Sequence, residues 1–76
     1  MIPKQTLETL ALRHLEGTGL SLVEVTVSED NDIEIVIGRE GGGVSIDDCV
    51  ALSRFIESNL DRDEEDFSLM VASAGI

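Results

Sequence analysis

The sequence predicts an α+β domain of two layers, in which two helices cover one face of a three-stranded sheet. Two stretches repeat apolar residues at helical spacing, three stretches alternate apolar with polar residues as strands do, and their order is α-β-β-α-β. The chain has 76 residues, enough for one small domain, and 42% of them are hydrophobic. We therefore expect residues 1–76 to form a single domain with a compact core.

The first helix is predicted from about Pro3 to Glu16, because apolar residues recur there every three or four positions. Pro3 suits the first helical position, where its missing N–H has no intrahelical partner to lose. Gly17 can take the left-handed conformation that ends a helix. The residues expected to face the core are Leu7, Leu10, Ala11 and Leu15.

A hairpin is predicted next, because two alternating stretches flank a turn-forming run at residues 29–32. The first strand spans about Leu20 to Ser28. The second spans residues 33–37, with Val36 on the outer face. The branched side chains expected on the inner face are Val23, Val25, Val27, Ile33, Ile35 and Ile37.

The second helix is predicted after a glycine-rich loop at residues 38–43, and Ser45 can cap it by accepting from the Asp48 N–H. An acidic run at residues 61–66 is too polar to continue the helix. Alternation over residues 67–72 predicts the third strand. The helix residues expected to face the core are Ile46, Cys49, Val50, Ser53, Ile56 and Leu60, with Leu52 beside them.

The strand order is predicted to be 2-1-3. A crossover through the second helix makes the third strand parallel to the second. We expect the third strand to lie beside the first, antiparallel to it, because pairing with the second would leave an isolated parallel pair in a very small sheet. The sheet is then fully antiparallel, and one core contains Leu10, Val25, Ile35, Ile56 and Leu69.

The charge of the chain bears on its partners. Sixteen acidic residues against five basic ones give a net charge of −11, which repels phosphate groups and attracts basic proteins. The basic residues are dispersed without aromatic neighbours, so no sequence-specific nucleic-acid binding is expected. Ordinary solubility charge is the alternative explanation. The residues predicted to meet a basic partner are Glu29, Asp30, Asp32, Asp61, Asp63, Glu64, Glu65 and Asp66.

Two further motifs are interpreted as connecting segments. The stretch from Gly38 to Gly41 has the GXXG shape of a KH nucleic-acid loop, but it joins a strand to a helix and lies among carboxylates. Asp61, Asp63 and Glu65 have the spacing of a calcium loop, but the glycine and the glutamate that complete an EF-hand are missing. Neither motif predicts a ligand site.

No catalytic site is predicted either. His14 falls near the end of the first helix, Cys49 falls on the apolar stripe of the second, and no third residue is placed to orient them. A single cysteine and a single histidine cannot build a structural zinc site. We expect no enzyme activity, no cofactor and no metal.

The cellular location follows from what the chain lacks. Its first residues do not have the basic-then-apolar layout of a signal peptide, and no apolar run approaches the length of a membrane span. One cysteine fits a reducing compartment. We expect a soluble cytoplasmic protein that binds no membrane.

Several short motifs, taken in order, resemble the N-terminal domain of the RimP family of ribosome maturation factors. They are GLSLVEV at residues 19–25, VSIDDC at residues 44–49, LSR at residues 52–54, LD at residues 60–61 and FSLMVASAG at residues 67–75. Two residues depart from the family pattern: Ala74 stands where proline is preferred, and Met70 stands where an acidic residue is frequent. The missing proline is expected to loosen the exit from the last strand.

The resemblance implies a non-enzymatic role in maturation of the small ribosomal subunit, through binding to the subunit and to a basic ribosomal protein. It also implies a second, C-terminal β-barrel domain that this chain does not contain, with Ser73, Ala74 and Gly75 as the exit toward it. Two alternatives remain open at this point. One is a KH-like RNA-binding domain, and the other is a general acidic adaptor that binds proteins outside the ribosome.

Overall fold

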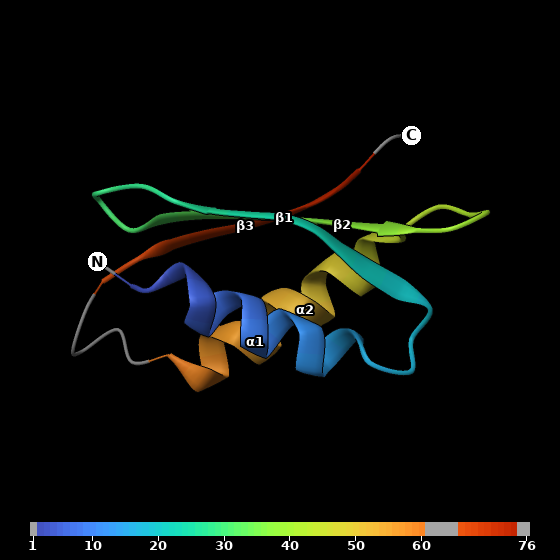
Figure 1. Ribbon diagram of the computed structural model, residues 1–76, viewed down its shortest axis with the longest axis horizontal. Coiled ribbons are helices and arrows are strands. Elements are labelled where there is room, and N and C mark those ends of the chain that lie inside the picture. Colours follow the sequence, from blue (N-terminus) through green and yellow to red (C-terminus); the bar gives the residue numbers. More distant parts are fainter. Residues whose placement is uncertain (1, 61–65, 75–76) are drawn as a thin grey trace.

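The computed structural model describes residues 2–60 and 66–74, and it confirms the predicted order of elements. Both helices lie beneath one face of a three-stranded sheet, and no described helix covers the other face (Figure 1). The elements in chain order are α1 (Lys4–Leu15), β1 (Leu20–Val27), β2 (Asp32–Arg39), α2 (Ile46–Asn59) and β3 (Ser68–Ser73). Helix α1 packs against β1, helix α2 packs against β3, and the helices contact each other. The predicted two-layer α+β architecture is therefore confirmed.

Helix α1 spans Lys4–Leu15 and buries the four residues predicted from its spacing. Gly17 has a φ of 79°, so it ends the helix in the left-handed conformation as expected. Pro3 is the N-terminal cap and not the first helical residue, because its own backbone is extended while its carbonyl accepts from the Thr6 N–H. The predicted start was wrong by this one position.

Strand β1 spans Leu20–Val27, and its inner face differs from the prediction. The register with β2 shifts between Leu22 and Glu24, which is a β-bulge, so the side chains change faces there. Val23 is consequently 57% exposed while Val25 is 2% exposed, and the prediction for Val23 was wrong. Leu20 and Leu22 pack against the core in its place.

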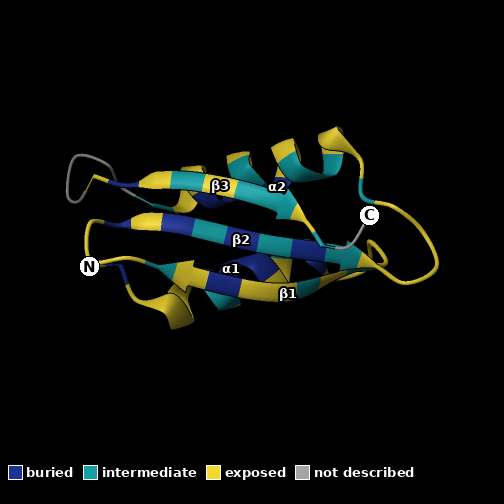
Figure 2. Ribbon diagram, turned by 90° about the horizontal axis from the view of Figure 1, so that it is seen from above, coloured by how far each residue is buried: buried dark blue, intermediate teal, exposed yellow. Residues whose placement is uncertain are grey.

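Strand β2 spans Asp32–Arg39 and lies in the centre of the sheet, so the observed order is β1-β2-β3. The predicted order 2-1-3 was wrong. Strand β2 carries Ile33, Ile35 and Ile37 as a fully buried row, and a strand that is this apolar is best shielded with a neighbour on each side. Figure 2 shows this burial along β2, with exposed residues more frequent on β1 and β3.

Strand β3 spans Ser68–Ser73 and pairs with β2 in parallel, without a register shift. The sheet is therefore mixed and not fully antiparallel, because β1 and β2 are antiparallel. The expected parallel relation of β3 to β2 is confirmed, and the small parallel pair that we expected the fold to avoid is present. Helix α2 forms the crossover that joins two parallel neighbours, and it packs against β3.

Helix α2 spans Ile46–Asn59, and Ser45 caps it by accepting from the Asp48 N–H as predicted. The predicted inner stripe was partly wrong, because Leu52 and Ile56 are buried while Ile46 and Val50 are exposed. Val50 lies two residues before Leu52, which is about 200° around the helix, so the two cannot face the core together. Cys49 and Leu60 are partly buried against the core.

The core forms one cluster between the sheet and the helices. Leu10, Val25, Ile35 and Ile56 belong to it, which confirms that part of the prediction, and Leu69 is partly buried against it. Ile2 also belongs to the cluster, although no helix or strand contains it. Because Ile2 lies outside every periodic stretch, the sequence pattern did not assign it.

Candidate partner-binding surface

The hairpin turn presents the first set of predicted acidic residues. The Ser28 hydroxyl accepts hydrogen bonds from the backbone N–H groups of Asp30 (3.2 Å) and Asp32 (3.0 Å), and this fixes the turn. The side chains of Glu29, Asp30 and Asp32 remain exposed. The turn is thus a defined loop that holds three carboxylates in solvent.

Asn31 is the buried residue of the same turn, and its φ of 60° is one that asparagine tolerates well. Its side-chain oxygen accepts from the Ile2 N–H (2.8 Å), and its amide donates to the Asp66 carbonyl (3.1 Å). Its backbone carbonyl accepts from the Ser68 N–H (3.0 Å). One side chain and its backbone therefore join the N-terminal segment, the hairpin turn and the start of β3.

Asn31 also determines how the predicted acidic residues are grouped. Its bond to Asp66 places this exposed carboxylate at the same end of the molecule as the hairpin turn. The predicted residues Asp61, Asp63, Glu64 and Glu65 lie outside the described residues. Of the predicted partner-binding set, the structure thus gathers Glu29, Asp30, Asp32 and Asp66, and we call these four residues the acidic end.

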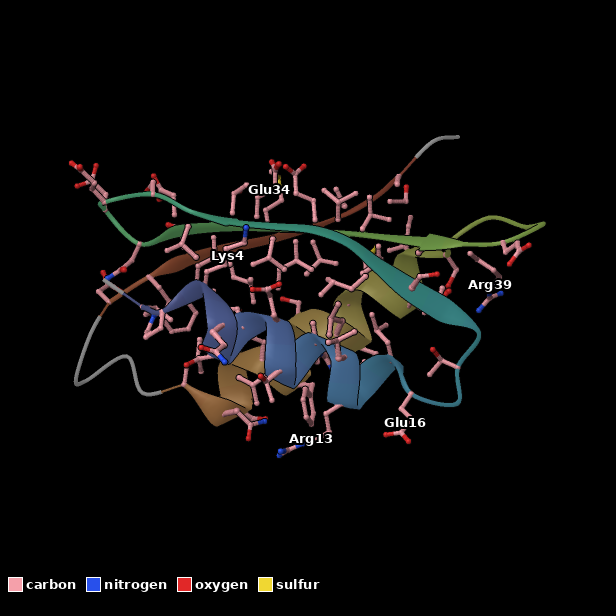
Figure 3. The ribbon with its side chains drawn as sticks, viewed as in Figure 1. Lys4, Arg13, Glu16, Glu34 and Arg39 are labelled. Carbon is pink, nitrogen blue, oxygen red and sulfur yellow. The ribbon has the colours of Figure 1, made fainter. Side chains whose placement is uncertain are left out.

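The basic residues that the structure describes lie elsewhere. Figure 3 shows Arg13 on the far side of α1 from the sheet, and Arg39 at the end opposite the hairpin turn. The Arg39 guanidinium lies 3.8 Å from the Asp48 carboxylate, and both side chains are partly exposed, so this ion pair contributes little stability. Among residues 2–60 and 66–74, no basic side chain forms an ion pair with the acidic end.

The GXXG stretch is a connecting turn in this fold, as interpreted from the sequence. Arg39 ends β2 and bridges to Gly42, and Gly41 has a φ of 73°, so the segment is a tight return toward α2. The Ser45 backbone N–H donates a hydrogen bond to the Asp48 carboxylate (3.0 Å). This bond lowers the pKa of the Asp48 carboxyl, and the Ser45 hydroxyl and the Arg39 charge lower it further. A carboxylate already occupies the N-terminus of α2, where an anion would bind.

His14 and Cys49 are held by packing in separate places. The His14 ring lies 5.0 Å from the Phe55 ring, centroid to centroid, at the contact between the two helices. Cys49 is partly buried between α2 and β3. Within residues 2–60 and 66–74, no group of three or more histidine, cysteine or acidic side chains is placed to hold a metal ion.

The exit from β3 is better fixed than the sequence suggested. The Ala74 N–H donates to the Ile37 carbonyl (2.7 Å), so the chain continues along β2 beyond the last residue of the strand. A proline, which the family prefers at this position, has no N–H for this bond. Ser73 and Ala74 are thus held against β2, and Gly75 lies outside the described residues.

Two features of this surface were missed by sequence reasoning. Asn31 was interpreted only as part of a polar turn, although an asparagine inside a run of acidic residues is itself a signal for a positive φ. The groove between α2 and β3 was also missed, because it depends on strand order. Neither described helix is long and apolar enough to cross a membrane.

Comparison with known proteins agrees with the motifs. The family model described as the RimP N-terminal domain matches residues 10–76. The chain is 46% identical over 74 residues to the ribosome maturation factor RimP of Christiangramia forsetii, covering 96% of this chain and 48% of that protein.

Two further relatives carry the same description. The RimP protein of Flavobacterium psychrophilum is 43% identical over 61 residues, which cover 80% of this chain and 39% of that protein. The RimP protein of Porphyromonas gingivalis is 41% identical over 76 residues, which cover 100% of this chain and 49% of that protein. The chain spans about half the length, or less, of these curated relatives. The chain belongs to the family of the RimP N-terminal domain.

Proposed function

We propose that this domain assists maturation of the small ribosomal subunit in the cytoplasm, without catalysis, by binding a basic ribosomal protein through its acidic end. Family membership supports the assembly role, since the relatives are described as ribosome maturation factors. The observation that supports the acidic end as the contact is the gathering of Glu29, Asp30, Asp32 and Asp66 around Asn31. Such a cluster accelerates the encounter with a positively charged protein.

The electrostatics favour a protein partner over bare RNA. The net charge of −11 repels a phosphate backbone, and the described cations are dispersed over α1, α2 and the end of β2. Arg39 faces Asp48 rather than an open basic surface. An RNA-binding domain of the KH type would instead gather positive charge along its nucleic-acid groove.

The proposal is tested by titrating purified small-subunit ribosomal proteins into the domain at several salt concentrations, with bare ribosomal RNA as the control. We expect at least one basic protein to bind, and its affinity to fall as salt screens the charges. We expect little RNA binding at any salt concentration. Tight binding of bare RNA together with indifference to basic ribosomal proteins would contradict the proposal and favour the KH-like alternative.

A matched pair of charge reversals locates the contact. The double variant Glu29→Lys and Asp30→Lys changes the acidic end, and Glu16→Lys with Glu40→Lys makes the same change in net charge away from it. All four side chains are exposed, and Figure 3 shows Glu16 at the end of the molecule opposite the hairpin turn. We expect the first pair to slow association about tenfold and the second to have a clearly smaller effect. Equal effects would mean that only net charge matters.

A further inference from the structure

We propose that the free edge of β3, with the groove between β3 and α2, binds an extended, positively charged polypeptide segment as a fourth strand of the sheet. The position of this site is argued from the geometry of the sheet alone. The identity of its ligand as a segment of a basic ribosomal protein rests on the proposed function.

The backbone of β3 has one side bonded and one side free. The Ser68 N–H donates to the Asn31 carbonyl (3.0 Å), and the Ala74 N–H donates to the Ile37 carbonyl (2.7 Å). In a regular parallel ladder every second residue bonds to the same neighbour, so the residues between these two alternate. The residues that direct both N–H and C=O away from β2 are Leu69, Val71 and Ser73, and no described residue bonds to those groups.

The edge of β3 also lacks the features that normally prevent strand addition. Edge strands are usually protected by a bulge, by charged side chains or by proline. Strand β1, the other edge, has a bulge beside Leu22 and carries Glu24. Strand β3 reads Ser-Leu-Met-Val-Ala-Ser, with no charge, no proline and no register shift. Of the two edges, β3 is the one suited to accept another strand.

A groove beside this edge can receive side chains of an added strand. Helix α2 flanks β3 along its length (Figure 2), and the space between them is about 430 Å³. Met70 of the same edge strand pairs with Glu34, so its side chain lies on the uncovered face of the sheet, where it is 54% exposed although it is apolar. Successive side chains of a strand point to opposite faces, so every second residue of a bound segment would enter the groove. Cys49 lines this groove, and the two charged residues in its lining, Arg54 and Glu57, have opposite signs and offset each other.

The charges around β3 favour a basic occupant. On β2, Asp32 lies opposite Ser68 and Glu34 lies opposite Met70, and Figure 3 shows Glu34 projecting from the uncovered face of the sheet. Exposed Asp66 comes shortly before β3. A second copy of this chain would bring the same net charge of −11 and be repelled, whereas a lysine- or arginine-bearing segment is attracted. We therefore assign the edge to a basic segment and not to self-pairing.

The probes for the experiment are overlapping peptides that tile the basic proteins of the small ribosomal subunit, together with one peptide that alternates lysine and valine. Binding is followed by amide hydrogen exchange and by labelling of Cys49 with a thiol reagent. We expect bound peptide to slow exchange at Leu69, Val71 and Ser73. It should also slow labelling of Cys49, because this side chain lines the groove.

The variants Met70→Lys and Val23→Lys form a matched pair. The two residues lie on opposite edge strands, are 54% and 57% exposed, and gain the same charge. A lysine on an edge strand opposes strand addition, so Met70→Lys should weaken peptide binding about tenfold while Val23→Lys changes it by less than about twofold. Equal weakening by the two variants would overturn the assignment to β3.

The remaining outcomes distinguish a failure of the proposed β3 site from a failure of the proposed function. If ribosomal proteins or peptides bind and the β3 amides stay unchanged, the edge proposal is wrong while the proposed function stands. If only the lysine–valine peptide protects the β3 amides, the proposed strand addition at β3 is supported, and the assignment of its ligand to a ribosomal protein is wrong. If no peptide protects β3, or if protection appears without peptide as the domain concentration rises, the assignment to a basic segment is overturned.

Discussion

Strands β1 and β3 form the two edges of one sheet, but they differ in regularity and in charge. Strand β1 has a bulge that turns Val23 outward, and it carries Glu24. Strand β3 keeps a single register with β2 and has no charged residue. The supporting helices differ too, since a side-chain capping box begins α2 behind β3, whereas the Pro3 cap of α1 behind β1 forms no side-chain hydrogen bond.

The difference shows that an edge position does not by itself determine what a strand can bind. A bulge and a charge make β1 a poor template for another strand, whereas the regular backbone of β3 remains available. Under the proposed function the free edge of β3 has a use, because flexible proteins that wrap around other molecules often bind as extended segments.

The largest effect is expected from Val25→Asp on β1, compared with Val23→Asp two residues away. Val25 is buried in the core, so an unpaired carboxylate there should cost several kcal/mol and unfold the domain. Val23 is exposed beside the bulge, so the same change should cost less than about 1 kcal/mol. Thermal unfolding followed by circular dichroism measures both. Similar losses at the two positions would contradict the bulge.

A second comparison uses proline on β3. By the register of the ladder, the Ala72 N–H meets the Ile35 carbonyl, so Ala72→Pro should remove a bond and cost about 3 kcal/mol. The Ser73 N–H points away from β2, so Ser73→Pro should change the free energy of unfolding by less than about 1 kcal/mol. Urea unfolding of both variants provides the values. The reverse ranking would mean that the free side of β3 is assigned wrongly.

A third prediction concerns Asn31, which ties the hairpin turn to the start of β3. Asn31→Ala leaves the Ile2 N–H and the Asp66 carbonyl without their partner and should cost about 2 kcal/mol. Asn31→Gly loses the same side-chain bonds but accepts the positive φ freely, so it should be the milder change. Chemical unfolding of the pair separates the two contributions. An Asn31→Ala domain as stable as the native one would exclude this structural role.

The sequence predicts the local structure of this domain, but not the details that depend on how its strands pair. The helical spacing of Leu7 and Leu10 and the alternation around Ile35 predict the element types and the faces that meet the core, because both patterns depend only on neighbours along the chain. The outward turn of Val23 depends on pairing with β2, and the order β1-β2-β3 depends on which strand best buries its isoleucines. Both are properties of the packed sheet. The acidic residues were visible in the sequence, but their gathering depends on the strand pairing that places Ser68 opposite Asp32 and on the Asn31 bond to Asp66.

The smallest effect is expected from Asp48→Asn, at the start of the helix behind β3. The pKa of Asp48 is lowered in the folded state by its bonds with Ser45, so its charged form favours folding. That contribution is present above the ordinary carboxyl pKa and is lost as the pH falls through the lower folded value. Urea unfolding across a pH series should show native and variant domains converging in stability below about pH 4. A difference that stays constant with pH would rule out the charged cap.

The central claim, that the outer side of β3 is free, is tested most directly by amide hydrogen exchange in the domain alone. The amides of Met70 and Ala72 bond to β2 in this register and should exchange slowly. The amides of Leu69, Val71 and Ser73 point outward and should exchange much faster, giving an alternating pattern along the strand. Uniformly slow exchange at all five positions at low protein concentration would contradict the account, because β3 would then be paired on both sides.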